Sequence, residues 1–334
     1  MGFVVAPKLL NISPIKYTKK RCFWNLMSWK SKMINPWNDM KNNTRRRVDG
    51  YNRYDIFWMV DLDGRYTFGI ELDFCIKASK RSVKFIGLNT LRKDSKDSTK
   101  FYIALNNNSN WQLFVLVCKD IISFLNTCNN GESVVDSIET RLLKWKKFFI
   151  SSDDDFGIEK QMGLFGELSF LSNIAAKQVG FEEALSSWVG ADFDKQDFLF
   201  NDCAVEIKTY KASKSPHVTI SSAYQLYTSK EKLYLAVYSL SINFQGLSVE
   251  DIIKSIEVKI ADVESFYKKL FSYGYKANFQ VELLKFKIDK ILFFNVDNKF
   301  PKITPIDIDF RIHNVKYTVD LLKCNEFLLE RIKL

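Results

Sequence analysis

Apolar and polar residues alternate in short runs along the first half of the chain, a pattern that predicts an antiparallel sheet. The predicted strands cover residues 55–61, 65–71, 82–87, 100–105 and 111–117, with a tight turn at 62–64 and a polar hairpin loop at 106–110. Helical periodicity follows over residues 119–127 and 134–149. We therefore expect residues 1–150 to form a β-rich domain that ends with helices.

The second half of the chain mixes helical and strand patterns. After a polar link at 151–155, the predicted elements are a helix over 158–178, a hairpin over 196–209, a helix capped by Ser221 or Ser222 that ends near 228, a strand over 232–240, helices over 248–260 and 262–273, and a strand pattern over 279–296. No Pro-, Gly- or Ser-rich linker separates these elements, so the tail extends the same domain. The prediction is a second domain over 151–334, in a chain of mixed α+β or α/β class.

The hairpin of the second half brings three ionisable residues to one face. Residues 196–200 and 203–209 have the aromatic and β-branched content of strands, and the Asn-Asp pair between them is typical of a turn. With a two-residue turn, Asp197 lies directly opposite Glu206. Side chains alternate along a strand, so Lys208 shares the face of Glu206. The sequence thus predicts two carboxylates and an ammonium in one place.

Two opposed carboxylates destabilise a sheet unless a partner neutralises them. A divalent cation would do so, and oxygen ligands suit Mg²⁺ or Mn²⁺, which polarise a phosphodiester and activate water. Lys208 would stabilise developing charge or orient the nucleophile. The alternative is a solvated hairpin face with an ordinary cross-strand Glu and Lys pattern, since such triplets are frequent in lysine-rich proteins.

These residues carry a resemblance to a known superfamily. Asp197 followed by Glu206-Ile-Lys208 on the next strand resembles the metal-binding core of the PD-(D/E)XK nucleases, whose common unit is a helix, a three-stranded meander, a helix and a strand. The flanking segments that add to the resemblance are Gly163-Leu-Phe-Gly-Glu-Leu168, Trp188-Val-Gly190, His217-Val-Thr-Ile-Ser-Ser-Ala-Tyr-Gln-Leu226, Phe300-Pro-Lys-Ile-Thr-Pro305 and Val315-Lys-Tyr-Thr-Val-Asp320. Together they are similar to the bacterial group described as "putative PD-(D/E)XK family members", often found beside restriction and phage-defence genes. Gln196 stands where the motif has its proline, a change that the superfamily tolerates because the aspartate does the chemistry.

The resemblance implies a role for each matching residue at the metal. Asp197, Glu206 and the carbonyl of Ile207 would hold Mg²⁺ or Mn²⁺, and Lys208 would assist the attacking water. Glu167, on the helix predicted before the hairpin, matches a helical acid that flanks the metal; the alternative for it is a surface glutamate. Gly163 and Gly166 weaken this helix by about 1 kcal/mol each relative to alanine, which suggests that something approaches its surface closely.

Three residues after the hairpin are further candidates for the site. Ser222 and Gln225 are three positions apart on the helix predicted there, and the resemblance points their face toward the site; a capping serine and a surface glutamine are the alternative. His217 precedes that helix and is a candidate contact to phosphate.

The charge is concentrated in the first half. Residues 1–150 hold 26 Lys and Arg against 13 Asp and Glu, a balance of +13, and residues 151–334 hold 23 against 26, a balance of −3, which together give +10. Basic residues there, including Arg45, Arg46 and Arg47, are interleaved with tryptophans such as Trp24, Trp29 and Trp37, a mixture that suits phosphate contacts and base stacking. The alternatives are a lysine-rich composition that favours solubility and, for the tryptophans, packing against neighbouring elements.

The remaining composition excludes several classes of protein. Six cysteines lie far apart without a Cys-x-x-Cys pair, which argues against zinc knuckles and disulfide frameworks, and only His217 and His313 are available for His-based sites. No apolar run approaches the roughly 20 residues of a membrane span, and the N-terminus has no signal-peptide layout. We expect a cytoplasmic protein without a membrane partner.

The leading hypothesis is a Mg²⁺-dependent endonuclease that acts on DNA in restriction or anti-phage defence. Its expected partners are DNA, other subunits of a defence system and a second copy of the chain in a homodimer. The alternative is a catalytically inactive nucleic-acid-binding or assembly subunit of a defence complex. The intact set of Asp197, Glu206 and Lys208 favours the enzyme.

Overall fold

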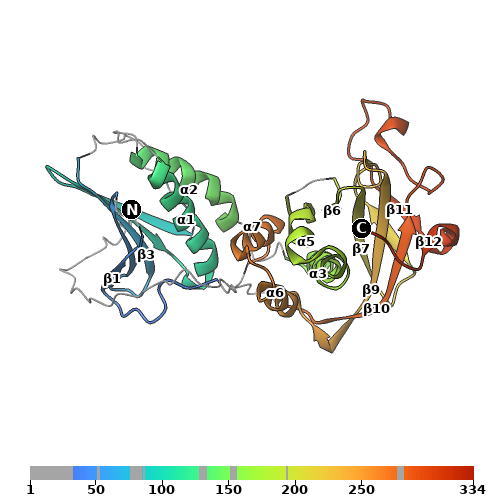
Figure 1. Ribbon diagram of the computed structural model, residues 1–334, viewed down its shortest axis with the longest axis horizontal. Helices are drawn as coiled ribbons and strands as arrows, with labels where there is room; N and C mark the ends of the chain where they lie inside the picture. Colours follow the sequence, from blue (N-terminus) through green and yellow to red (C-terminus); the bar gives the residue numbers. More distant parts are fainter. Residues whose placement is uncertain are drawn as a thin grey trace, which may run out of the picture. The chain divides into compact units, whose positions relative to one another are not determined.

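The computed structural model describes residues 33–334, apart from residues 51–52, 76–84, 86, 128–133, 151–155, 193–194 and 277–281. The chain divides into two compact units, and their described parts fall within Met33–Ser152 and Asp153–Leu334 (Figure 1). Each unit has its own sheet and its own helices. Among the described residues, no helix is long and apolar enough to cross a membrane.

The first unit is an antiparallel sheet with two helices packed on one face (Figure 1). The strand order is β1 (Thr44–Arg47), β2 (Asp55–Val60), β3 (Tyr66–Leu72), β5 (Thr99–Leu105) and β4 (Leu88–Asp94), and the helices are α1 (Trp111–Thr127) and α2 (Val134–Ile150). The core between them includes Phe68 and Ile103 of the sheet and Phe114 and Ile138 of the helices, all fully buried. The strands predicted at 55–61, 65–71 and 100–105 and the helix predicted at 134–149 are confirmed.

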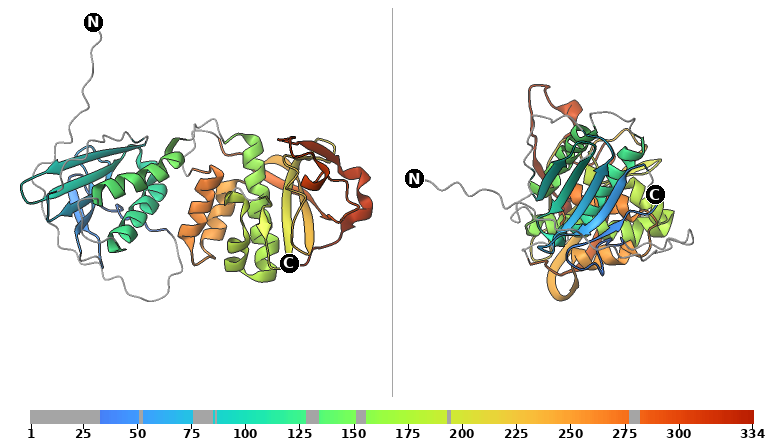
Figure 2. Two further views of the ribbon diagram at one scale, coloured as in Figure 1. Left: turned by 90° about the horizontal axis from the view of Figure 1, so that it is seen from above. Right: turned by 90° about the vertical axis from the view of Figure 1, so that its left-hand side faces the viewer.

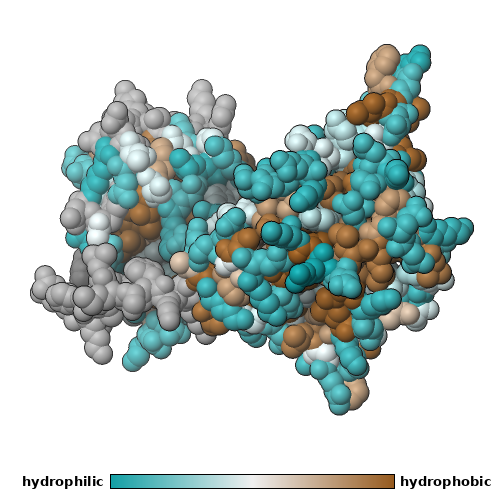
Figure 3. Space-filling view, turned by 45° about the vertical axis from the view of Figure 1, so that its right-hand side comes forward, coloured by the Kyte–Doolittle hydropathy of each residue, from teal (hydrophilic) through white to brown (hydrophobic). Residues whose placement is uncertain are grey.

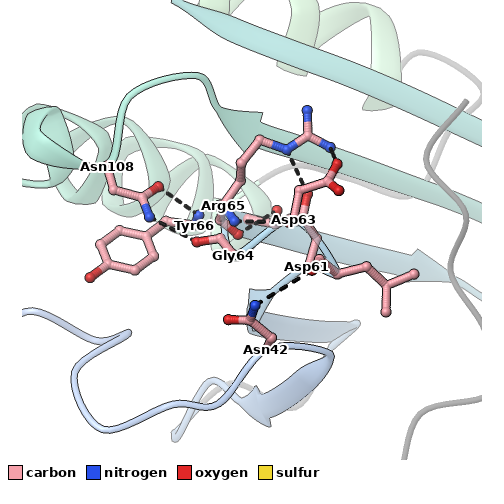
Figure 4. Close-up of polar contacts among 9 residues, drawn as sticks. Asn42, Asp61, Asp63, Gly64, Arg65, Tyr66 and Asn108 are labelled. Atoms are coloured by element: carbon pink, nitrogen blue, oxygen red, sulfur yellow. Dashed lines mark hydrogen bonds and ion pairs between the residues drawn. The ribbon is translucent and has the colours of Figure 1, made fainter. Parts of the chain in front are cut away.

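The turn between β2 and β3 is held by polar side chains (Figure 4). Arg65 contacts Asp61 at 2.8 Å and Asp63 at 3.2 Å. The Asn108 side chain accepts from the N–H of Tyr66 and donates to the carbonyl of Gly64, both within 2.9 Å. Gly64 has a φ of 80°, a left-handed conformation that glycine adopts without steric cost. The predicted turn is therefore confirmed, and a residue 44 positions away secures it.

Two predictions for the first unit are wrong. Residues 111–117 begin the helix α1, and residues 108–110 form a short 3₁₀ turn before it, where the side chain of Asn107 caps the N–H of Ser109. Six consecutive residues of α1, from 113 to 118, are buried. A helix segment buried on every side loses its polar face, so its sequence is indistinguishable from that of a buried strand.

Two other predictions meet the limits of the described residues. Most of the strand predicted at 82–87 lies outside them, and the neighbouring strand, β4, begins at Leu88. Trp24 and Trp29 also lie outside the described residues. Trp37 is buried, stacks on Tyr66 and Phe114, and donates its indole N–H to the Thr67 carbonyl, so it packs in the core and its ring is not available to a nucleic acid.

The second unit is a mixed sheet with helices on one face and a small two-stranded sheet on the other (Figures 1 and 2). The main sheet has the order β12 (Leu328–Leu329), β10 (Phe286–Asn295), β9 (Lys232–Leu247), β7 (Cys203–Lys211) and β6 (Phe198–Leu199), and the small one pairs β8 (His217–Ile220) with β11 (Tyr317–Asp320). The pair β7 and β9 is parallel, and the other neighbours are antiparallel. Leu235 and Val237 of β9 pack with Val218 of β8 and Val319 of β11 in the core between the two sheets.

Most helices predicted for the second unit are present. They are α3 (Ile158–Phe170), a π-helical turn (Leu171–Ala175), α4 (Ala176–Val179), α6 (Val249–Glu257) and α7 (Val263–Tyr273), and the structure adds a short helix that was not predicted, α5 (Phe181–Ser187). The first three are continuous and confirm the helix predicted at 158–178. Ser248 and Asp251 form a capping box at α6, and Asp262 caps α7, as the residue types at these positions predict.

The helix predicted to start at Ser221 or Ser222 is wrong. Residues 221–230 form turns, and β8 and these turns connect β7 to β9. The buried Gln196 side chain donates to the carbonyls of Tyr224, at 2.7 Å, and Tyr227, at 2.9 Å. An α-helix would use its carbonyls internally, so these bonds stabilise a turn in its place. The expected three-stranded meander is reduced to β6, β7 and a single bridge between Trp188 and Phe198.

A segment between β10 and β11 projects from the second unit and carries exposed apolar side chains (Figures 1 and 3). Phe310 is 85% exposed and Ile306 is 77% exposed. The segment is closed at its base, where the N–H of Ile303 donates to the Tyr317 hydroxyl at 3.1 Å.

Candidate active site

The hairpin register places Asp197 beside β7. Phe198 pairs with Val205 and Leu199 with Ala204, which confirms the two-residue turn. The backbone carbonyl of Asp197 accepts from the N–H groups of Val189 and Gly190, at 2.9 and 3.0 Å. Its carboxylate accepts from the N–H of Ile207 at 2.6 Å. Backbone and side chain are both held, so the carboxylate has a defined position at the edge of the sheet.

Glu206 and Lys208 form an ion pair on β7. The ammonium of Lys208 lies 2.6 Å from one carboxylate oxygen of Glu206, whose side chain is 1% exposed, while that of Lys208 is 16% exposed. The second oxygen, Oε2 of Glu206, is buried without a hydrogen-bond partner in the part of the chain that the structure describes. A buried carboxylate oxygen without a donor is costly, so this atom is a natural ligand for a cation.

Glu167 reaches the same region from α3. It is 6% exposed, and the indole N–H of Trp188 donates to its Oε2 at 2.7 Å. The hydroxyl of Tyr273, at the end of α7, forms a second hydrogen bond with its carboxyl group. The surface-glutamate alternative for Glu167 is therefore wrong.

Three glycines allow these close approaches. A Cβ at Gly163 would lie 2.6 Å from the Tyr273 hydroxyl, and one at Gly166 would lie 2.6 Å from the Thr209 side chain. At Gly190 a Cβ would lie 2.6 Å from Oδ1 of Asp197 and 3.2 Å from Oε2 of Glu167. The close approach that the α3 glycines predicted is thus confirmed, and the carboxylates of Asp197 and Glu167 both border the small space beside Gly190.

The electrostatics of the site are dominated by burial and by the mutual repulsion of its carboxylates. Burial and the neighbouring Asp197 raise the pKa of Glu206 to about 8. Burial and Asp197 also raise the pKa of Glu167 well above its usual range. Burial raises the pKa of Asp197, although Lys208 and the Ile207 N–H oppose it. Burial lowers the pKa of Lys208, but attraction to Glu206 and Asp197 outweighs it and raises the value. One ammonium thus serves three carboxyl groups, and a cation would favour their charged forms.

The donor set fits a hard divalent ion held by few protein ligands. Within the described residues, no group of three or more His, Cys, Asp or Glu side chains is arranged to hold a metal. Two carboxylates, from Asp197 and Glu206, are the smaller set that Mg²⁺ commonly uses while it keeps several waters. The buried Oε2 of Glu206 without a donor supports this fit.

The pH dependence of stability tests the buried carboxyl groups directly. The folded pKa of Glu206, about 8, lies above its ordinary value of 4.5, so the folded state keeps a proton that the unfolded state loses between these values. The contribution of Glu206 to the free energy of unfolding is then fully present below about pH 4.5. It decreases as the pH rises and is lost once the pH passes 8. In chelator, we expect the free energy of unfolding in urea to be lower at pH 8 than at pH 5.5 by on the order of 2 kcal/mol. Glu206→Gln should make this slope shallower, because it removes one of the carboxyl groups with a raised pKa. An equal slope in the variant would contradict the assignment.

The other predicted site residues of the second unit lie in the segment after β7. The Gln225 side chain accepts from the N–H of Ser221 at 2.7 Å, and the Ser222 hydroxyl accepts from the N–H of Tyr224 at 3.2 Å. His217 is exposed on β8, 3.9 Å from Asp320. Ser222 and Gln225 thus stabilise the turn that replaces the predicted helix. Gln196, the residue before Asp197, donates to the carbonyls of Tyr224 and Gln225 in that turn.

The three arginines of the first unit have separate environments on β1. Arg45 is largely buried, pairs with Glu71 at 2.9 Å and lies over the ring of Phe57. Arg46 points to the opposite face, because side chains alternate along a strand, and its guanidinium donates to the Pro36 carbonyl at 3.4 Å. Arg47 is half-exposed and pairs with Asp55 at 2.6 Å.

Residues 27–322 match the model of the DUF4420 family, whose description reads "Putative PD-(D/E)XK family member". The chain belongs to this family. No match was found among curated proteins or among solved structures. Family membership agrees with the resemblance of Asp197 and Glu206-Ile-Lys208 to the nuclease motif and supports a nuclease-like protein.

The match to the PD-(D/E)XK family member extends well beyond the hairpin. It includes the sheet of the first unit and the helices α6 and α7 of the second. Tyr273 and Trp188, which contact Glu167, therefore lie within the residues that match the family model. Sequence reasoning noted Trp188 only as a flanking motif and missed Tyr273, because a tyrosine at the end of an amphipathic helix carries no local signal of a site.

Proposed function

We propose that this PD-(D/E)XK family member is a metal-dependent endonuclease that hydrolyses phosphodiester bonds of DNA in bacterial restriction or anti-phage defence. The observation that carries the proposal is the buried Oε2 of Glu206, which has no donor among the described residues although it adjoins Asp197 and Lys208. A carboxylate pair with an ammonium and an unused oxygen is suited to phosphodiester hydrolysis.

Asp197, Glu206 and the Ile207 carbonyl would hold Mg²⁺ or Mn²⁺, which supplies a Lewis acid for the phosphate and lowers the pKa of water. The Ile207 N–H donates to Asp197. Since the N–H and C=O of one strand residue point to the same side, its carbonyl is directed toward Asp197 as well. The backbone of β7 thus supports both ligands on that side.

Lys208 has two roles in this proposal. Its ammonium holds the Glu206 carboxylate through the 2.6 Å contact, which keeps Oε2 directed away from the lysine. The same charge would stabilise the negative charge that develops on the phosphate oxygens and orient the attacking water. Glu167, fixed by Trp188 and Tyr273, would support the site from α3, and Gln225 would act from the turn that Gln196 secures.

The proposal is tested with supercoiled plasmid in Mg²⁺, Mn²⁺ or chelator. Wild-type protein should cleave DNA only with metal, and Glu206→Gln should reduce the rate by at least about 100-fold. Glu257→Gln is the matched control, because Glu257 is also buried in the second unit but lies on α6, beside Tyr267. Cleavage of RNA but not of DNA would show that the proposed substrate, DNA, is wrong. Metal-independent DNA binding without cleavage would favour the inactive binding or assembly subunit.

Contacts to DNA phosphates are proposed for Arg46, Arg47, His217 and Ser222, with Arg45 in a supporting position. Each phosphate neutralised contributes about −0.9 to the slope of log affinity against log salt. A double variant, Arg46→Gln with Arg47→Gln, should make the slope shallower by about 1 to 2 and weaken binding equally on unrelated sequences. The double variant spares the buried Arg45–Glu71 pair.

Fluorescence anisotropy with two unrelated duplexes measures this slope. Lys254→Gln serves as a control, since Lys254 is an exposed cation that pairs with Glu250 on α6. An unchanged slope in the double variant would show that Arg46 and Arg47 of β1 do not contact the DNA phosphates. The basic first unit would then be a candidate surface for other defence subunits or for the second copy of a homodimer.

A further inference from the structure

Helix α7 lies against the site although the hairpin motif does not include it. Tyr273, in its last turn, hydrogen-bonds Glu167, and Lys269, four residues earlier on the same face, donates to the backbone carbonyl of Trp188. The space for the hydroxyl is built into α3: a Cβ at Gly163, one turn before Glu167, would lie 2.6 Å from the Tyr273 oxygen. Helix α7 therefore contacts both Glu167 and its other donor, Trp188.

Glu167 needs such support because of its surroundings. It is buried beside Asp197, and Glu206 adds further repulsion. A Cβ added at Gly190 would lie within 3.2 Å of oxygens from both Glu167 and Asp197. The two carboxylates are therefore close, and a small rotation of either one changes the distance between them. Two donors on one carboxylate, an indole N–H and a phenolic hydroxyl, restrict that rotation.

We infer that Tyr273 is a positioning residue of the nuclease site: its hydroxyl, together with the indole of Trp188, holds the Glu167 carboxylate beside Asp197 in the orientation that catalysis uses. The inference rests on the proposed nuclease function. It extends that site to Tyr273 of α7, which lies more than 60 residues beyond the Glu206-Ile-Lys208 motif.

The direct test is Tyr273→Phe, which removes the hydroxyl and keeps the ring. The matched control is Tyr267→Phe, which removes a hydroxyl from the same helix, 3.5 Å from Glu257. Tyr273→Phe should lower kcat and raise the Mn²⁺ concentration needed for half of the thermal shift, each by about 10-fold, while KM for DNA stays unchanged. In metal-free protein, the indole N–H resonance of Trp188, assigned with Trp188→Phe, should shift in Tyr273→Phe and stay in place in Tyr267→Phe.

A second variant, Gly163→Ala, separates positioning from a loss of stability. It retains the hydroxyl but displaces it, because the new Cβ would lie 2.6 Å from the Tyr273 oxygen. Alanine also favours the helix relative to glycine. Gly163→Ala should therefore reproduce the kcat, Mn²⁺ and resonance changes of Tyr273→Phe without the lower melting temperature that a purely structural role predicts.

The outcomes separate this inference from the proposed function. If wild-type protein shows neither cleavage nor a metal-induced thermal shift, the proposed function is wrong and the inference falls with it. If wild-type protein is active and Tyr273→Phe behaves as Tyr267→Phe in all three measurements, the inference alone is overturned. A lower melting temperature of Tyr273→Phe with unchanged kcat, Mn²⁺ response and Trp188 resonance would also overturn it.

Discussion

Replacing Asp197 with asparagine is expected to abolish cleavage while the metal-free protein stays folded and becomes more stable at pH 8. The amide oxygen can still accept the N–H of Ile207, so the local backbone keeps its bond. The change removes a charge that repels both Glu167 and Glu206, and Lys208 keeps its partner. We expect a rate loss of at least about 10³-fold and a gain in stability on the order of 1 kcal/mol.

Single-turnover cleavage and urea unfolding in chelator measure these two effects. Mn²⁺ should raise the melting temperature of the wild type, since a ligand bound only by the folded state stabilises it, and should leave that of Asp197→Asn unchanged. Asp202→Asn, two residues before Ala204 and exposed in the hairpin turn, is the control for a lost aspartate charge. An Asp197→Asn variant with full activity would show that Asp197 has no catalytic role.

Gly190→Ala is expected to disrupt the site without touching an ionisable residue. The added Cβ would lie 2.6 Å from Oδ1 of Asp197, 3.0 Å from the Cα of Asp197 and 3.2 Å from Oε2 of Glu167. Because one of these atoms is backbone, the strain cannot be relieved by a side-chain rotation alone. We expect a loss of about 1–3 kcal/mol in stability and of about 100-fold in cleavage, the usual cost of displacing catalytic groups by about 1 Å.

Gly157→Ala provides the matched control for this experiment. Gly157 precedes α3 in the same unit, has an ordinary φ of −65°, and has no atom within 4 Å of the position that a Cβ would take. It should retain wild-type activity and stability. Wild-type behaviour of Gly190→Ala would show that Asp197 and Glu167 have more freedom than the structure gives them.

The candidate site was largely predictable where its geometry depends on residues close together in the chain. The two-residue turn sets the hairpin register, and strand alternation then brings Glu206 and Lys208 to one face opposite Asp197. The glycines of α3 also predicted a close contact on the helix surface, although the sequence did not identify the residues that make it. The contacts of Trp188 and Tyr273 with Glu167 span 21 residues and more than 100 residues, respectively, and no local pattern encodes them.

The sequence by itself determined the elements whose signals are local: the strands around the turn at Gly64, the hairpin after Asp197, and the capped helices α6 and α7. Only the tertiary structure decided the state of residues 111–117, because burial on all sides of α1 removes the periodicity that distinguishes a helix from a strand. It also decided the turn at 221–230, where the carbonyls of Tyr224 and Tyr227 accept from Gln196, which lies 28 and 31 residues earlier, respectively. Local propensity does not reveal a hydrogen-bond donor from a distant part of the chain, so these segments take the conformation that their surroundings stabilise.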